Sequence, residues 1–153
     1  MVKTFTETES VFSEILLNQV IDKLNRIMET ELAGVVRYTH YSLMVFGPNR
    51  IPITSWLRDQ ATESLLHSQE AGELVTYLGG HPSLGIGPLL ETHKHDIFNI
   101  LEESLEHESR QMQLYKDLLE LVQDKSVMFE EYARKMISEE QTHIGEVRKM
   151  MRS

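Results

Sequence analysis

Apolar residues recur every three or four positions along most of this chain, and clusters of glycine and proline divide the pattern into long segments. In the first segment the spacing is carried by Leu24, Ile27, Met28, Leu32, Val35 and Val36. It is the period of an amphipathic helix with one side facing a core. Phe98 and Met150 are assigned to the apolar sides of the last two segments. The pattern predicts four helices, over about residues 13–46, 53–78, 92–122 and 126–151, each far longer than a typical strand.

The lengths of the linkers predict how these helices are connected. About seven residues join the first helix to the second and about three join the third to the fourth, and short links make neighbouring helices antiparallel. The longer segment from Gly79 to Glu91 can cross the length of a bundle. Thr54 or Ser55 is expected to cap the second helix. The predicted fold is all-α, an antiparallel four-helix bundle with one long crossover, over residues 13–153 after an N-terminal extension of residues 1–12.

Composition and charge exclude several classes of function. The chain of 153 residues has no cysteine, which excludes disulfide scaffolds, zinc–thiolate sites and iron–sulfur clusters. With 15 basic and 24 acidic side chains its net charge is −9, which argues against a nucleic-acid partner. No apolar run is long enough to span a membrane, and residues 1–10 lack the features of a signal peptide. We therefore expect a cytoplasmic protein with no membrane or nucleic-acid partner.

Acidic residues interrupt the apolar side of every predicted helix near its middle. These glutamates, with the histidines that accompany two of them, are Glu31, Glu63, His67, Glu108, Glu140 and His143. Burying a carboxylate is costly unless an opposite charge or a metal ion compensates it. The same interval of 32 residues separates Glu31 from Glu63 and Glu108 from Glu140. Each hairpin thus brings one glutamate opposite a glutamate–histidine pair, and two hairpins bring all six groups together.

This set of carboxylates and imidazoles indicates a metal centre. Oxygen and nitrogen ligands suit iron or manganese, with zinc as a competitor, and four carboxylates neutralise two divalent cations. The segment Glu140-Gln-Thr-His143 has the Glu-x-x-His spacing of di-iron carboxylate bundles, whereas Glu63 and His67 are one residue further apart. The alternative interpretation is a set of solvated glutamates and hydrogen-bonded core histidines.

Several neighbouring residues leave the ligand set open. A shift of one position in helix phase, as a π-bulge would cause, lets Glu106, His107 or Glu139 replace Glu108 or Glu140. Tyr38, on the same side of its helix as Glu31, is a candidate for contacting a ligand or donating electrons. His93 and His95 form a polar helix start or, alternatively, bind a metal or line a channel, and His40 is interpreted as a packing residue.

The sequence resembles bacterioferritin and the wider ferritin-like di-iron family over about residues 24–151. The resemblance is carried by Leu24-Asn25-Arg26 with Glu31-Leu32 and Tyr38, by Tyr77-Leu78-Gly79-Gly80-His81-Pro82, and by Glu139-Glu140-Gln141-Thr142-His143. It implies a ferritin-like bundle, storage of iron, oxidation of Fe²⁺ to Fe³⁺ at a di-iron ferroxidase centre inside each subunit, and a homo-oligomer that forms a hollow shell. Glu31, His67, Glu140 and His143 match the ligand positions of the family directly.

The chain departs from the family pattern at three places. Ser64 stands where the family has its second-helix glutamate, so that Glu63 is expected to serve instead, and the position of the third-helix glutamate falls on His107. Leu65 replaces the methionine that binds haem in bacterioferritin, so no haem is expected. The short fifth helix of the family is missing, which makes the size of the shell an open question.

The favoured hypothesis is a ferroxidase that binds two Fe²⁺ ions and oxidises them with dioxygen or peroxide. Glu63 and Glu140 are expected to be shared ligands, with Glu31 and Glu108 as outer carboxylates and one histidine for each ion. The alternatives are a non-storage di-iron oxidase or reductase with an organic substrate, and a metal-free helical interaction module. A DNA-protecting mini-ferritin is disfavoured by the negative charge.

Overall fold

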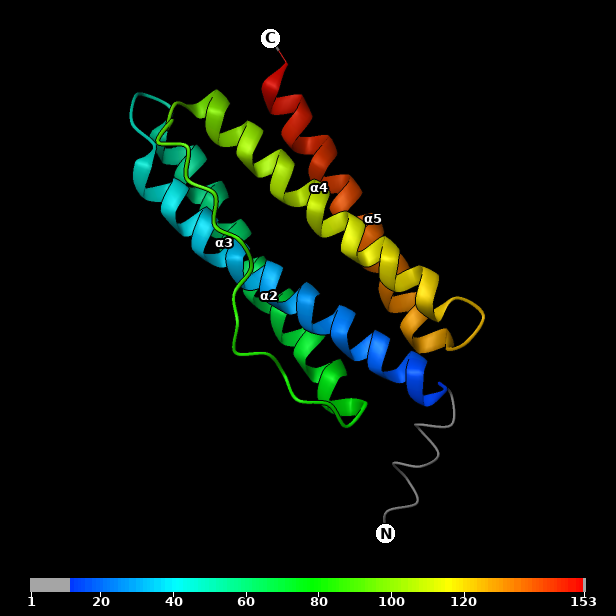
Figure 1. The fold of residues 1–153 in the computed structure, drawn as a ribbon. Helices are drawn as coiled ribbons and strands as arrows, with labels where there is room; N and C mark the ends of the chain where they lie inside the picture. Colours follow the sequence, from blue (N-terminus) through cyan, green and yellow to red (C-terminus); the bar gives the residue numbers. More distant parts are fainter. Residues whose placement is uncertain (1–11, 153) are drawn as a thin grey trace.

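The computed structural model describes residues 12–152 and shows a bundle of long α-helices in two hairpins (Figure 1). The helices are α2 (Glu14–Met44), α3 (Arg50–Tyr77), α4 (Ile97–Val122) and α5 (Val127–Met151). Within residues 12–152 there is no strand. This confirms the predicted all-α architecture. Most of the predicted N-terminal extension, residues 1–11, lies outside the described residues.

Two helices begin at other residues than predicted. Helix α4 begins five residues later than expected, because Asp96 caps it by accepting a hydrogen bond from the backbone N–H of Asn99 at 3.0 Å. The preceding His93 has a φ of 56°, which is outside the helical region. Helix α3 begins at Arg50 and includes Pro52 in its first turn, where backbone N–H groups have no partner within the helix.

The expected caps of α3 are wrong, since both residues lie inside the helix. Thr54 instead donates a hydrogen bond from Oγ1 to the backbone carbonyl of Ser42 on α2, at 3.4 Å. Ser55 is exposed on the surface of α3. No side chain caps α3 at Asn49. The pattern located the helix but placed its start three residues too late.

Apolar side chains form two clusters, one toward each end of the bundle. The larger combines the first half of α2 with the second halves of α3 and α4 and the first half of α5, and includes Leu24, Val75, Tyr115, Phe129 and Met136. The smaller joins the other end of α2 to the starts of α3 and α4, and includes Tyr38, Tyr41, Val45, Leu57 and Ile100. The predicted glutamates lie between the two clusters along the helices.

Three residues that the pattern assigned to the core are on the surface. Val36, Phe98 and Met150 are 43%, 52% and 40% exposed. Phe98 and Met150 lie next to helix ends, where a stripe that is read as continuous has drifted off the core side. Val36 lies inside α2, where only part of each turn faces the core.

The crossover between α3 and α4, residues 78–96, runs along α2, as Figure 1 shows. The side chain of Asn25 accepts a hydrogen bond from the backbone N–H of Ser83 at 2.8 Å. Further along, the N–H of Gly87 donates to the carbonyl of Glu29 at 2.8 Å. A Cβ on Gly87 would lie 3.1 Å from the backbone of Thr30, so glycine permits this close approach. The predicted crossover is confirmed and is fixed against one helix.

Candidate metal centre

The middle of the bundle contains a cavity between all four helices. Its lining consists of Glu31, Gln60, Glu63, Ser64, His67, Glu108, Glu139, Glu140 and His143. All six residues that the sequence predicted for the site are in this set. The cavity offers about 20 Å³ to the centre of a water-sized particle, which is room for one to two such particles. The structure thus brings the predicted residues together, with little free space among them.

On one side of the cavity, Glu31 of α2 faces His67 of α3. Glu31 is only 2% exposed, and its Oε2 lies 3.2 Å from Nδ1 of His67. The hydroxyl of Tyr115, on α4, donates a hydrogen bond to the same oxygen at 2.7 Å. Together with Glu140 of α5, Glu31 and His67 each offer a donor atom within 4.8 Å of the other two. These three side chains form the first group of candidate ligands.

On the other side of the cavity, Glu108 of α4 faces His143 of α5. Oε1 of Glu108 lies 3.7 Å from Nε2 of His143 and accepts a short hydrogen bond from the hydroxyl of Tyr38. The ring of Trp56 stacks on the imidazole of His143, with the planes 3° apart. Tyr38 and Trp56 therefore hold Glu108 and His143, the second group of candidate ligands.

Glu140 lies between the two groups. Its Oε2 is buried and has no hydrogen-bond partner among the described residues. A buried carboxyl oxygen without a partner is costly, because desolvation is not compensated. A positively charged ligand at this oxygen would compensate the cost of burying it.

The mouth of the cavity is formed by more exposed carboxylates. The side chains of Glu63 and Glu139 are 51% and 39% exposed, and their oxygens lie 3.7 Å and 3.3 Å from Nε2 of His67. His67 itself is 7% exposed and reaches Glu31 through its other ring nitrogen. A cation that arrives from solvent thus meets Glu63 and Glu139 before the buried groups.

Burial and mutual contacts shift the pKa values of the buried carboxyls. Burial raises the pKa of Glu31 to about 7 and, with the negative charge of Glu108, raises that of Glu140 well above its ordinary value. Burial also opposes ionisation of Glu108, but a hydrogen bond from Glu140 and the charge of His143 outweigh it and lower its pKa. Burial and the neighbouring charge of Glu108 thus make the carboxyl of Glu140 hold its proton more tightly than an exposed glutamate does, by raising its pKa.

The pKa values of the two buried histidines move in opposite directions. Burial tends to lower the pKa of His67, but its hydrogen bond to Glu31 and three nearby carboxylates raise it to about 9. Burial lowers the pKa of His107 to about 4, which keeps that imidazole neutral. A cation that binds Glu140 or His67 would replace the proton on that side chain.

The residues that the sequence left as alternative ligands differ in whether they line the cavity. Glu106 is exposed and pairs with Arg110 at 2.7 Å, away from the cavity. His107 is buried, yet it is not among the cavity-lining residues and packs near Gly34. Glu139 lines the cavity together with Glu140, so both are candidate ligands. Tyr38 contacts Glu108, as its position beside Glu31 suggested.

Two supporting contacts were not predicted from the sequence. Tyr115 lies two turns after Glu108 on the same side of α4 and donates a hydrogen bond to Glu31. Trp56, the single tryptophan of the chain, stacks on His143. The helical spacing offered a signal for Tyr115, whereas nothing in the sequence linked Trp56 to α5.

The donor set fits two divalent cations. Five carboxylates and two imidazoles line the cavity from four helices, which includes the four carboxylates and two imidazoles that carboxylate-bridged dinuclear sites in helical bundles require. Cations would neutralise Glu140 and satisfy its buried oxygen. Fold and donor set together define the class of ferritin-like helical bundles with a carboxylate–histidine cavity.

The family follows from a direct match of the sequence. Residues 21–153 match the model of the ferritin-like domain family, and the chain belongs to this family. No curated protein matches the sequence significantly.

Solved structures show the same fold at low sequence identity. A ferritin-like di-iron-carboxylate protein from Bacillus anthracis is 19% identical, with a TM-score of 0.85 over 92% of this chain and 100% of that one. The bacterioferritin of Desulfovibrio desulfuricans is 22% identical, with a TM-score of 0.77 over 90% and 81%. A dodecameric thioferritin from Bacteroides fragilis is 20% identical, with a TM-score of 0.80 over 93% and 91%. The expected family and fold are therefore confirmed.

Proposed function

We propose that this protein is an iron-storage ferroxidase, which binds two Fe²⁺ ions in the central cavity and oxidises them to Fe³⁺ with dioxygen or peroxide. The observation that carries the proposal is Glu140, whose buried carboxyl oxygen has no hydrogen-bond partner in the described part of the chain. Cations between Glu140 and its neighbours would remove the cost of burying it. The membership in the ferritin-like family supports iron as the metal.

Each candidate ligand has a role that its position supports. Glu31 and His67 would hold one ion, and Glu108 and His143 the other. Glu140 contacts both groups and is the best candidate for a shared ligand. We assign no bridging role to Glu63, because its side chain is half exposed at the mouth. With Glu139, it would receive incoming Fe²⁺.

The electrons and protons of the reaction balance. Two Fe²⁺ ions give two electrons to dioxygen, which takes up two protons and leaves as hydrogen peroxide, or to hydrogen peroxide, which takes up two protons and leaves as two water molecules. His67 must lose its proton before it can bind a cation, so loading of the cavity releases a proton. The hydroxyl of Tyr38 keeps Glu108 oriented throughout.

The shape of the cavity favours this function over a di-iron oxidase with an organic substrate. Space for one to two water-sized particles suits ions between the side chains and leaves no room for an organic substrate beside them. A metal-free interaction module would leave the buried oxygen of Glu140 uncompensated. Haem is not part of the proposal, because Leu65 offers no ligand atom.

The proposal includes a homo-oligomer, with a hollow shell as the storage form. Similar structures include a thioferritin that is described as dodecameric. Exposed apolar side chains on α2 and α3, among them Leu43, Ile51 and Leu66, offer surface for subunit contacts. Light scattering distinguishes a shell of many subunits from a dimer.

A cytoplasmic location is also part of the proposal. Among the described residues, no helix is long and apolar enough to cross a membrane.

Stopped-flow absorbance after anaerobic loading with Fe²⁺ tests the activity. The wild type should form a ferric species on mixing with oxygen, and the double variant Glu31→Gln/His143→Asn should lose this phase. Glu106→Gln is the matched control, since it removes an exposed carboxylate that lies outside the cavity. The proposal is wrong if the wild type forms no oxygen-dependent ferric species, or if the double variant reacts as fast as the control.

A further inference from the structure

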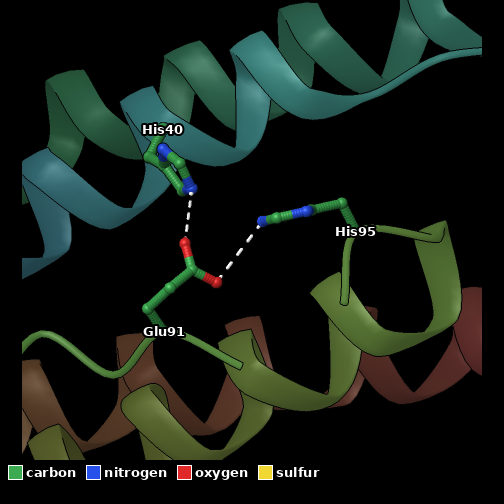
Figure 2. Close-up of side chains that lie close together, drawn as sticks. All are labelled: His40, Glu91 and His95. Atoms are coloured by element: carbon green, nitrogen blue, oxygen red, sulfur yellow. Dashed lines mark hydrogen bonds and ion pairs between the residues drawn. The ribbon is translucent and has the colours of Figure 1, made fainter. Parts of the chain in front are cut away.

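We propose that a second metal site, for one divalent transition-metal ion, is formed by His40, Glu91 and His95 where the crossover meets α2. Figure 2 shows the two imidazoles pointing at the carboxylate of Glu91, each toward a different oxygen. None of these residues lines the central cavity, so this proposal is independent of the ferroxidase proposal. The sequence analysis interpreted His40 as packing and left a metal role for His95 open.

The distances fit ligands of a single ion. Nε2 of His40 lies 3.0 Å from Oε2 of Glu91, and Nε2 of His95 lies 3.4 Å from Oε1. All three donor atoms are within 4.8 Å of one another. Two ligands of a tetrahedral ion with bonds of about 2.1 Å are about 3.4 Å apart. An ion therefore fits among the three side chains with small adjustments of their rotamers.

His95 provides an independent sign of a missing ligand. Its Nε2 is buried from solvent and has no hydrogen-bond partner in the described structure. A polar ring nitrogen in that position is normally satisfied by a donor, an acceptor or an ion. The nitrogen is directed toward Glu91 and His40 (Figure 2), which places a shared ligand in the space between them.

The backbone holds Glu91 in place for this role. The N–H of His93 donates a hydrogen bond to Oε1 of Glu91 at 2.6 Å. That hydrogen bond and the nearby histidines lower the pKa of Glu91, so its side chain is a carboxylate. His93 has a φ of 56°, an unusual conformation for a residue with a side chain, and this bend brings Glu91 and His95 to the same side.

The donor set defines the class of ion. Two imidazoles and one carboxylate are the ligands of catalytic zinc sites and of many non-haem iron sites, and they leave coordination positions for water. Magnesium and calcium prefer oxygen ligands only. Zn²⁺ and Fe²⁺ share the required chemistry, so both are tested and Mg²⁺ is the negative control. The ion would bind the crossover to α2 just before α4 begins.

The rate of trypsin cleavage after Lys94 reports specifically on metal binding at this second site. The side chain of Lys94 is exposed between His93 and His95, and cleavage after it requires the surrounding segment to open locally. At a free Zn²⁺ concentration ten times the dissociation constant, cleavage after Lys94 should slow about tenfold in the wild type. His40→Asn and Glu91→Gln should abolish this protection, and His93→Asn, the neighbouring histidine outside the triad, should keep it.

Metal counting gives a second readout and separates the two proposals. Equilibrium dialysis against Zn²⁺ should find one ion fewer per chain in His40→Asn/His95→Asn than in the wild type. Glu31→Gln/His143→Asn should lose central ions and retain the protection of Lys94. The same comparison is repeated anaerobically with Fe²⁺, and protection by either ion but not by Mg²⁺ supports the site. Equal metal content and equal cleavage in His40→Asn/His95→Asn and the wild type, with both ions, would overturn it.

Discussion

The ring of Trp56 lies parallel to the imidazole of His143, with the ring centroids 5.7 Å apart and the planes at 3°. This contact joins the first half of α3 to the second half of α5, across the bundle. It fixes the orientation of an imidazole whose Nε2 lies 3.7 Å from Glu108. A candidate ligand of the central cavity is thus positioned by a residue that offers no ligand atom itself.

Removing this ring should weaken metal binding without removing a ligand. Residues that orient metal ligands contribute about 10–100-fold to affinity, so Trp56→Ala should lower the affinity of the cavity for Fe²⁺ by that order. Trp56→Phe retains an aromatic face and should lose much less. Anaerobic titration with Fe²⁺ measures both variants, and circular dichroism checks that both are folded. Equal affinities of the two variants would show that the stacking has no such role.

The hydrogen bond between Tyr115 and Glu31 should contribute to stability. The Tyr115 hydroxyl is fully buried and donates to Oε2 of Glu31 at 2.7 Å. Tyr115→Phe removes the donor and should lower the free energy of unfolding by about 1 kcal/mol. Tyr77→Phe is the matched control, because Tyr77 is 48% exposed. Urea unfolding of the metal-free protein gives both values, and a loss in the control as large as in Tyr115→Phe would contradict the assignment.

The metal-free protein should lose stability as the pH rises above neutral. Burial raises the pKa of Glu31 from 4.5 to about 7, and hydrogen bonding to Glu31 with nearby carboxylates raises that of His67 from 6.5 to about 9. Both groups bind protons more tightly in the folded state. Their contribution to stability is complete below the unfolded pKa values and is lost as the pH passes 7 and then 9. The buried His107, with its pKa lowered to about 4, titrates below this window.

Metal binding should show the opposite trend, because the ligands must be deprotonated. The increase in melting temperature caused by Mn²⁺, measured without oxygen because Mn²⁺ oxidises in alkaline air, should therefore grow between about pH 6 and pH 9. Differential scanning calorimetry with and without Mn²⁺ measures both trends. Glu31→Gln cannot titrate and should flatten the curve of the metal-free protein. A metal-free wild type that becomes more stable from pH 7 to pH 9 would refute the shifted pKa values.

The fold could be predicted from the sequence because the helical periodicity is strong and glycine and proline residues stand where the periodic segments end. Apolar residues at three- and four-residue spacing fixed the helices, and Gly79 and Gly80 marked the end of the second. The starts of α3 and α4 were less predictable. Pro52 is tolerated in a first turn, and the cap of α4 depends on Asp96, which has several polar neighbours of similar capping ability.

The central site was predictable for a different reason. Glu31, Glu108 and Glu140 contradict the apolar side on which they lie, and each is a buried carboxyl in the structure, whereas Glu63 lies exposed at the mouth of the cavity. The triad of His40, Glu91 and His95 could not be found in this way. It depends on the path of the crossover, which no periodicity encodes, and on the positive φ of His93.

Replacing Gly34 by alanine should lower the stability of the protein, although alanine is normally favoured over glycine in a helix. A Cβ there would lie 2.8 Å from Oγ of Ser64 and 3.0 Å from Nε2 of His107, and both of these side chains are buried. An alanine in a helix normally stabilises by about 1 kcal/mol relative to glycine. Overpacking in a core costs about 1–3 kcal/mol, so Gly34→Ala should give a net loss of stability.

Gly145→Ala provides the matched control for this substitution. Gly145 lies within α5, and a Cβ there would meet nothing within 4 Å. That variant should gain about 1 kcal/mol, because only the helix propensity changes. In Gly34→Ala/Ser64→Ala the nearest contact is removed, and part of the lost stability should return. Urea unfolding of the metal-free variants measures the series, and a Gly34→Ala protein as stable as Gly145→Ala would show that α2, α3 and α4 have room to separate beside the cavity.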